Sequence, residues 1–140
     1  MEIGGFDVTQ VRRHDFEMFL RLIAGQTWTY NPVAGAVYNF MINPDAISSN
    51  KAEVHYYSIR GLLNNEATYG GGDMDRLLRD HWSMLLVNVR KFGCSAAYHN
   101  AAELMMSRMS KRDQLRSRIV AALAPHTSRL YRVGRRVLRG

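Results

Sequence analysis

The stretch that decides the fold is residues 73–93, which read DMDRLLRDHWSMLLVNVRKFG. Its apolar side chains recur every three or four residues from Met74 to Phe92, a spacing that places them on one face of an α-helix. Asp73 can cap the first turn, and Gly93 is a natural stop because glycine readily adopts the left-handed backbone at helix ends. This stretch therefore predicts an amphipathic helix with one buried face.

Two further helical stretches follow it along the chain. Ser95 can cap a long helix that reaches Ala124. Pro125 is expected to end that helix, because proline lacks the amide hydrogen that the helix needs and its ring clashes with the preceding turn. A last amphipathic segment covers residues 127–139.

Three shorter apolar stripes precede the deciding stretch. The first begins at Asp7, with Gln10 as its partner in a capping box, and runs to Gly25. The second covers residues 31–43, where proline stands in the first turn and a second proline follows the last. The third covers residues 48–65, with serine and asparagine at its start. Each stripe predicts one helix.

Alternation typical of β-strands is weak throughout the chain, and short connections between several helices favour a bundle. We therefore predict an all-α fold, a helical bundle of five or six helices, in a single domain over 1–140. Three glycines at 70–72 form a hinge. The part before it, 1–70, can act as an N-terminal arm, and residues 73–140 form a basic helical part.

Positive charge is concentrated at the C-terminal end. Residues 1–103 hold 9 basic and 11 acidic side chains, whereas residues 104–140 hold 10 basic side chains and one acid, Asp113. The net charges of the two parts are therefore −2 and +9. Arginine supplies 16 of the 19 basic residues, and it binds phosphate in a bidentate manner. The codon usage of a GC-rich genome would explain the arginine excess equally well.

Two groups of arginines are candidates for contact with nucleic acid. The first group is spaced at four residues and shares a helix face with Leu115 and Ile119, unless the buried face drifts and leaves these arginines solvated. The second group lies on the last amphipathic segment. The predicted nucleic-acid-binding residues are Arg108, Arg112, Arg116, Arg129, Arg132, Arg135, Arg136 and Arg139.

Few side chains near these arginines could read base edges. We therefore expect sequence-independent contacts with phosphates, with double-stranded DNA as the favoured partner and an affinity that falls steeply with salt. An anionic membrane surface and an acidic protein are the alternative partners of a basic amphipathic helix. Tyrosines and Trp28 within 26–69 also hint at self-association, because such residues are favoured at interfaces.

The sequence predicts no catalytic residue, no metal site and no cofactor. No two of the five histidines are three to five residues apart, and Cys94 is the only cysteine. The glycines at 70–72 lack the Gly-Lys-Ser/Thr ending of a phosphate-binding loop. No apolar run approaches the roughly 18 residues of a membrane span, and we find no signal peptide. We expect a structural protein, not an enzyme.

Together, these features resemble the major coat proteins of filamentous and rod-shaped archaeal DNA viruses. The helical stripes at 8–23, 74–92 and 96–123 and the arginines from Arg108 to Arg139 carry the likeness. The resemblance implies a coat subunit, alone or with a related subunit, that self-assembles around DNA. It implies a place in the virion after assembly in the host cytoplasm; otherwise we expect a cytoplasmic protein. The alternative is a small regulatory or adaptor module whose basic C-terminal helix binds an acidic protein or a membrane.

Overall fold

The computed structural model describes residues 4–23, 51–69 and 72–137, and this part of the chain contains six α-helices and no strand. The predicted all-α helical bundle is therefore confirmed. The helix predicted over 31–43 lies outside the described residues. The helices are α1 (His14–Ile23), α2 (Lys51–Asn64), α3 (Glu66–Tyr69), α4 (Gly72–Phe92), α5 (Ala96–Met105) and α6 (Lys111–Val137).

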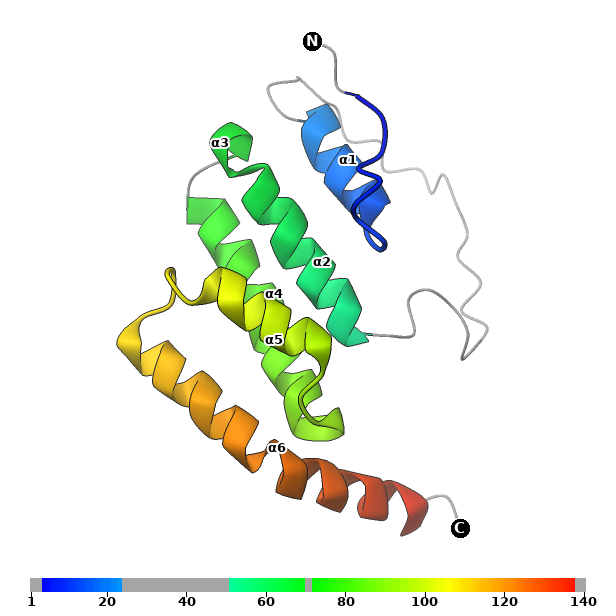
Figure 1. The fold of residues 1–140 in the computed structure, drawn as a ribbon, viewed down its shortest axis with the longest axis vertical. Helices are drawn as coiled ribbons and strands as arrows, with labels where there is room; N and C mark the ends of the chain where they lie inside the picture. Colours follow the sequence, from blue (N-terminus) through cyan, green and yellow to red (C-terminus); the bar gives the residue numbers. More distant parts are fainter. Residues whose placement is uncertain (1–3, 24–50, 70–71, 138–140) are drawn as a thin grey trace, which may run out of the picture.

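The helices stack in an order that leaves α1 and α6 on opposite sides of the bundle (Figure 1). α2 packs against α4 and α5, which form the middle of the molecule. α1 packs mainly on α2, and α6 packs mainly on α4. As a result, one long face of α6 has no described helix beyond it (Figure 1).

The core lies where α2, α4, α5 and α6 meet. Ile59 of α2, Leu85 of α4 and Ala101 of α5 are fully buried. The Trp82 and Tyr98 rings stack with their centroids 5.7 Å apart, which fixes α5 against α4. α2 contributes to this core, and Phe16 and Leu20 of α1 pack against it, so both helices, which lie within the stretch 1–70 predicted as a possible arm, belong to the bundle.

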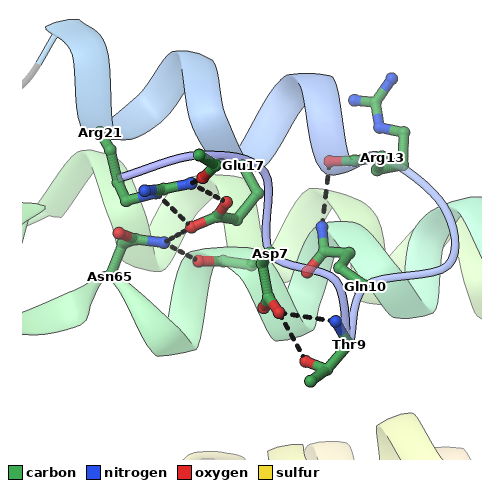
Figure 2. Close-up of polar contacts among 9 residues, drawn as sticks. Asp7, Thr9, Gln10, Arg13, Glu17, Arg21 and Asn65 are labelled. Carbon is green, nitrogen blue, oxygen red and sulfur yellow. Dashed lines mark hydrogen bonds and ion pairs between the residues drawn. The ribbon is translucent and has the colours of Figure 1, made fainter. Parts of the chain in front are cut away.

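The first helix begins at His14, seven residues later than the predicted start at Asp7. The Asp7 carboxylate accepts hydrogen bonds from the backbone N–H and the hydroxyl of Thr9, at 2.8 and 2.7 Å, and so closes a tight turn (Figure 2). The side chain of Gln10 is buried and donates to the carbonyl of Arg13, which has a φ of 60°. The predicted capping box is therefore wrong, because its two side chains bond elsewhere.

A buried carboxylate fixes α1 to α2. Glu17 accepts two hydrogen bonds from Arg21, at 2.8 and 2.9 Å, and one from Asn65 at 3.0 Å (Figure 2). Asn65 also donates to the carbonyl of Gly61 at 2.9 Å. A side chain at Gly61 would place its Cβ 3.4 Å from the Cβ of Glu17, so glycine lets the two helices approach closely here.

The deciding stretch forms α4 almost as predicted. The helix begins at Gly72, so Asp73 lies in its first turn and not at the predicted capping position. There it forms an ion pair with Arg76 at 3.2 Å. Gly93 has a φ of 91°, and its N–H donates to the carbonyl of Val89 at 2.8 Å. The predicted stop at Gly93 is confirmed, with the left-handed backbone that glycine allows.

The long helix predicted from Ser95 to Ala124 is broken. Ser95 caps α5 as predicted, accepting from the N–H of Tyr98, but α5 ends at Met105. Ser110 then caps α6: its hydroxyl accepts from the N–H of Asp113 at 3.2 Å and donates to the Asp113 carboxylate at 2.6 Å. Ser110 is therefore the N-cap of α6, and a serine at this position favours a helix start over continuation.

Pro125 lies inside α6, so the predicted stop there is wrong. Proline cannot donate to the carbonyl of Ala121, and the Cys94 thiol lies 3.9 Å from that oxygen as a substitute donor. The hydroxyl of Thr127 donates to the carbonyls of Leu123 and Ala124, both at 3.3 Å. Side-chain donors around the proline therefore allow one helix to run to Val137.

Candidate nucleic-acid interface

α6 has two faces of different character. Its inner face contributes Val120, Ala124 and the small buried side chains of Ser117 and Ser128 to the bundle. Small residues here let the helix lie close to α4. Its outer face carries large apolar residues that stay exposed, among them Leu115 at 60% and Ile119 at 50%. Leu115 and Ile119, which share a face with the predicted arginines, therefore lie outside the core.

Three arginines from two helices line one hollow on this side of the molecule. Arg90 comes from the last turn of α4, and Arg112 and Arg116 come from the first turns of α6. The hollow has a volume of about 830 Å³, and Leu115, Ile119, Leu123, Val120 and Thr127 also line it. Within the described residues, no ion pair or hydrogen bond occupies any of the three guanidinium groups.

Only one carboxylate borders this hollow among the residues that the structure describes. Asp113 accepts the hydroxyl of Ser110 and lies in the first turn of α6. Its charge offsets one of the three arginines, so the hollow keeps a positive balance. Guanidinium groups whose stems pack on leucine and isoleucine can reach a phosphate without losing their apolar contacts.

Arg108 stands apart from the other predicted residues. It lies in the turn between α5 and α6, so it does not share a helix face with Arg112 and Arg116 as the four-residue spacing predicted. Its guanidinium donates to the Glu66 carboxylate and forms an ion pair with it. This bond lowers the pKa of Glu66 and raises that of Arg108. Arg108 is therefore engaged by a carboxylate of its own chain.

The C-terminal arginines follow on the same helix. Arg129 is exposed, and Arg118, which the sequence argument omitted, is exposed as well. Arg132, Arg135 and Arg136 lie on the helical backbone of α6, which ends at Val137. Their side chains are not described, and Arg139 lies outside the described residues. The continuous helix thus joins the two groups of arginines that the sequence separated at Pro125.

Sequence reasoning also missed Arg90. In sequence it looks like an ordinary basic residue in the last turn of a helix, where it suits the helix dipole. Only the packing of α6 on α4 brings it beside Arg112 and Arg116. The available signal was the exposed position of Arg90 on the wheel of residues 73–93, outside the apolar stripe.

A pair of histidines lies between α2 and α4, and neither of them lines the hollow of Arg90, Arg112 and Arg116. The Nδ1 atoms of His55 and His81 are 3.1 Å apart. Burial, and then the nearby charges of His55 and Arg13, lower the pKa of His81 to about 4, against a smaller opposing effect of Asp80. Two ligands do not complete a metal site, and the described part of the chain contains no group of three or more histidine, cysteine, aspartate or glutamate residues suited to a metal.

In the part of the chain that the structure describes, the fold is an all-α bundle in which α6 carries arginines without a described partner beside an exposed apolar stripe. No protein-family model matches the chain, and no curated protein or solved structure is significantly similar to it. The likeness to archaeal viral coat proteins stays a prediction. None of the described helices has the length and apolar character that a membrane crossing requires.

Proposed function

We propose that the protein is a structural nucleic-acid-binding protein that neutralises phosphates without reading sequence. One observation carries this proposal: Arg90, Arg112 and Arg116 surround one open hollow and are unpaired within the described residues. Unpaired arginines that gather at one place repel each other, and an anion between them offsets that repulsion. The continuation of α6 toward the remaining C-terminal arginines extends the same charge along one helix.

The geometry favours a polymer over a single phosphate. α6 has 27 residues, so its axis is about 40 Å long, the length of roughly one turn of a DNA duplex. Its basic residues form two groups, at 111–118 and 129–136, one toward each end of the helix. Binding of this kind depends on phosphate spacing and not on bases, so affinity for unrelated sequences should be equal.

The packaging role is the finer part of this proposal. Subunits that coat a genome must bind every sequence and associate with each other or with a related coat subunit. We propose double-stranded DNA as the partner and the virion as the location. The alternative, a regulatory or adaptor module, differs by requiring one acidic protein partner whose binding is insensitive to salt.

The test is the salt dependence of DNA binding. Anisotropy of a short labelled duplex, measured with the full chain between about 50 and 200 mM salt, should give a straight line in a plot of log K against log salt. Replacing Arg90, Arg112 and Arg116 together by glutamine should make the slope shallower by up to about 2.7, because each phosphate contact contributes about 0.9. Two duplexes of unrelated sequence should behave alike.

The matched control is Arg76→Gln, which removes one exposed arginine from the start of α4, where Asp73 already pairs with it. The salt slope of this control should stay unchanged, whereas Arg112→Gln alone should make the slope shallower by about 0.9. Truncation after Pro125 is a poorer test, because it would remove the buried Ser128 and the Tyr131 ring that packs on Phe92. An equal effect of the control and the Arg112 variant would refute the proposed interface.

A further inference from the structure

The outer face of α6 carries an apolar stripe that phosphates do not explain. We call it the outer stripe. All of its side chains are at least half exposed: Leu115 60%, Ile119 50%, Leu123 52%, Leu130 72% and Val133 55%. The residues between its ends span about 27 Å along the helix axis. A stripe of this length is larger than the scattered apolar residues normal for a protein surface.

The outer stripe lies opposite the buried face of the same helix. At 100° per residue, Leu115, Ile119 and Leu130 fall within a 60° arc, about 140° from the mean direction of the buried Val120, Ala124 and Ser128. Among the described helices, α6 packs mainly on α4, through the face that carries Val120 and Ala124. The described bundle therefore buries one face of α6 and leaves the apolar residues of the opposite face in water.

Basic side chains border the outer stripe along both edges. On the same wheel, Lys111, Arg118 and Arg129 lie along one edge and Arg116 lies along the other, whereas Arg112 lies in line with the stripe at its N-terminal end. All five of these basic side chains are exposed. The side chain of Arg116 also lines a second hollow, together with Arg108. The only acid of α6 is Asp113. A partner for this face must therefore offer both an apolar surface and negative charge.

Charge complementarity separates the candidate partners. A second copy of α6 would bring two strongly positive helices together, so like charges would oppose the apolar contact. Nucleic acid supplies the negative charge but leaves leucine and valine against a polar backbone. A bilayer with anionic lipids supplies acyl chains for the stripe and headgroups for the arginines on both edges.

We infer that the outer stripe of α6 binds the surface of an anionic membrane, with the helix axis parallel to the bilayer plane. Leu115, Ile119 and Leu123 enter the boundary between headgroups and acyl chains. The flanking arginines extend their stems along the apolar boundary and place their guanidinium groups at the phosphates. This inference goes beyond the proposed function, and it assigns the protein a contact that packaging of nucleic acid alone would not need.

The test is flotation of the full chain with vesicles of phosphatidylcholine that contain roughly 30% phosphatidylserine, against vesicles of phosphatidylcholine alone. We expect binding to the anionic vesicles and at least tenfold weaker binding to the neutral ones. Each arginine near an anionic surface raises the membrane affinity about fivefold. The variant Leu115→Ser, Ile119→Ser, Leu123→Ser should lose about tenfold or more of the remaining affinity.

The matched control is Val8→Ser, Val11→Ser, Met84→Ser, which removes three apolar side chains that are 94%, 70% and 56% exposed and lie away from α6. It should bind vesicles within about twofold of the natural chain. Circular dichroism and urea unfolding establish that both triple variants fold, as expected for changes at exposed positions. A second variant, Leu130→Ser with Val133→Ser, changes two residues of the outer stripe that do not line the hollow of Arg90, Arg112 and Arg116. It should also weaken vesicle binding but keep its affinity for duplex DNA, so failure of the membrane inference is distinguishable from failure of the proposed function.

Three outcomes would overturn the inference. One is equal vesicle binding by the stripe variant and the natural chain. Another is absence of binding to anionic vesicles by the natural chain. The third is sedimentation showing a dimer that the stripe variant abolishes while its vesicle binding remains, which would assign the outer stripe to a second copy. Vesicle binding that the stripe variant loses, and that the control keeps, supports the inference.

Discussion

Replacing Glu17 by alanine should loosen the first helix from the bundle. Its side chain is 5% exposed and accepts two hydrogen bonds from Arg21 and one from Asn65. The variant Glu17→Ala leaves the Arg21 guanidinium, itself 24% exposed, without this acceptor. Breaking a fully buried ion pair costs about 3–5 kcal/mol, and the partial exposure of Arg21 reduces the expected loss here to about 2–3 kcal/mol.

The assay is urea unfolding monitored by circular dichroism, with Glu103→Ala on the exposed side of α5 as the control. The control should change the free energy of unfolding by less than about 0.5 kcal/mol. A double-mutant cycle with Arg21→Ala should give a coupling energy of about 1–2 kcal/mol, because Arg21 also donates to the carbonyl of Gly5 and keeps that bond in Glu17→Ala.

Hydrogen exchange separates local from global loosening. α1 packs mainly on α2, so its release need not unfold the core of α2, α4 and α5. The amides of residues 17–23 should lose protection in Glu17→Ala more than those of the buried turns around Leu85. A loss of stability below about 0.5 kcal/mol, with unchanged protection in α1, would refute the role assigned to this carboxylate.

Two further predictions concern pH and backbone conformation. Because the pKa of His81 is lowered to about 4, the unfolded chain binds a proton there between about pH 6.5 and 4 that the folded chain does not. The free energy of unfolding should therefore decrease by about 1–2 kcal/mol as the pH is lowered through that window, after solvent screening. The variant His81→Gln should remove this part of the pH dependence in urea unfolding. Gly93→Ala should cost about 1–2 kcal/mol in thermal unfolding because φ is 91° there, whereas Gly72→Ala, with no atom within 4 Å of the added Cβ, should change stability by less than about 0.5 kcal/mol; equal effects would contradict the strain argument.

The sequence predicted α4 well because every signal for it is local. Its apolar spacing, its acidic first turn and the glycine after Phe92 all lie within 22 residues. The end of α5 was missed although a local signal existed: Ser110 is an N-cap residue inside what looked like one long helix, and its hydroxyl accepts from the N–H of Asp113. Apolar side chains keep their helical spacing across the break, so periodicity alone does not mark the end of α5.

The course of α6 through Pro125 depends on contacts that no local pattern contains. The thiol near the freed carbonyl of Ala121 comes from Cys94, which lies 27 residues earlier in the chain. The candidate site has the same origin. Arg90 meets Arg112 only through the packing of α4 on α6, and Arg108 is paired with Glu66, 42 residues away. The sequence identified the charge, but it could not identify which arginines are paired.

Two features of α6 run against local rules for a stable helix. Lys111 and Arg112 stand in its first turn, where the helix dipole favours acids, and the outer stripe exposes apolar area that folding normally buries. Both features have unfavourable free energies in the isolated chain, and neither contributes to the core. A bound polyanion would offset the first, and an apolar surface beyond α6 would offset the second. Locally unfavourable positions of this kind are expected at functional surfaces, which is why both proposals concern α6.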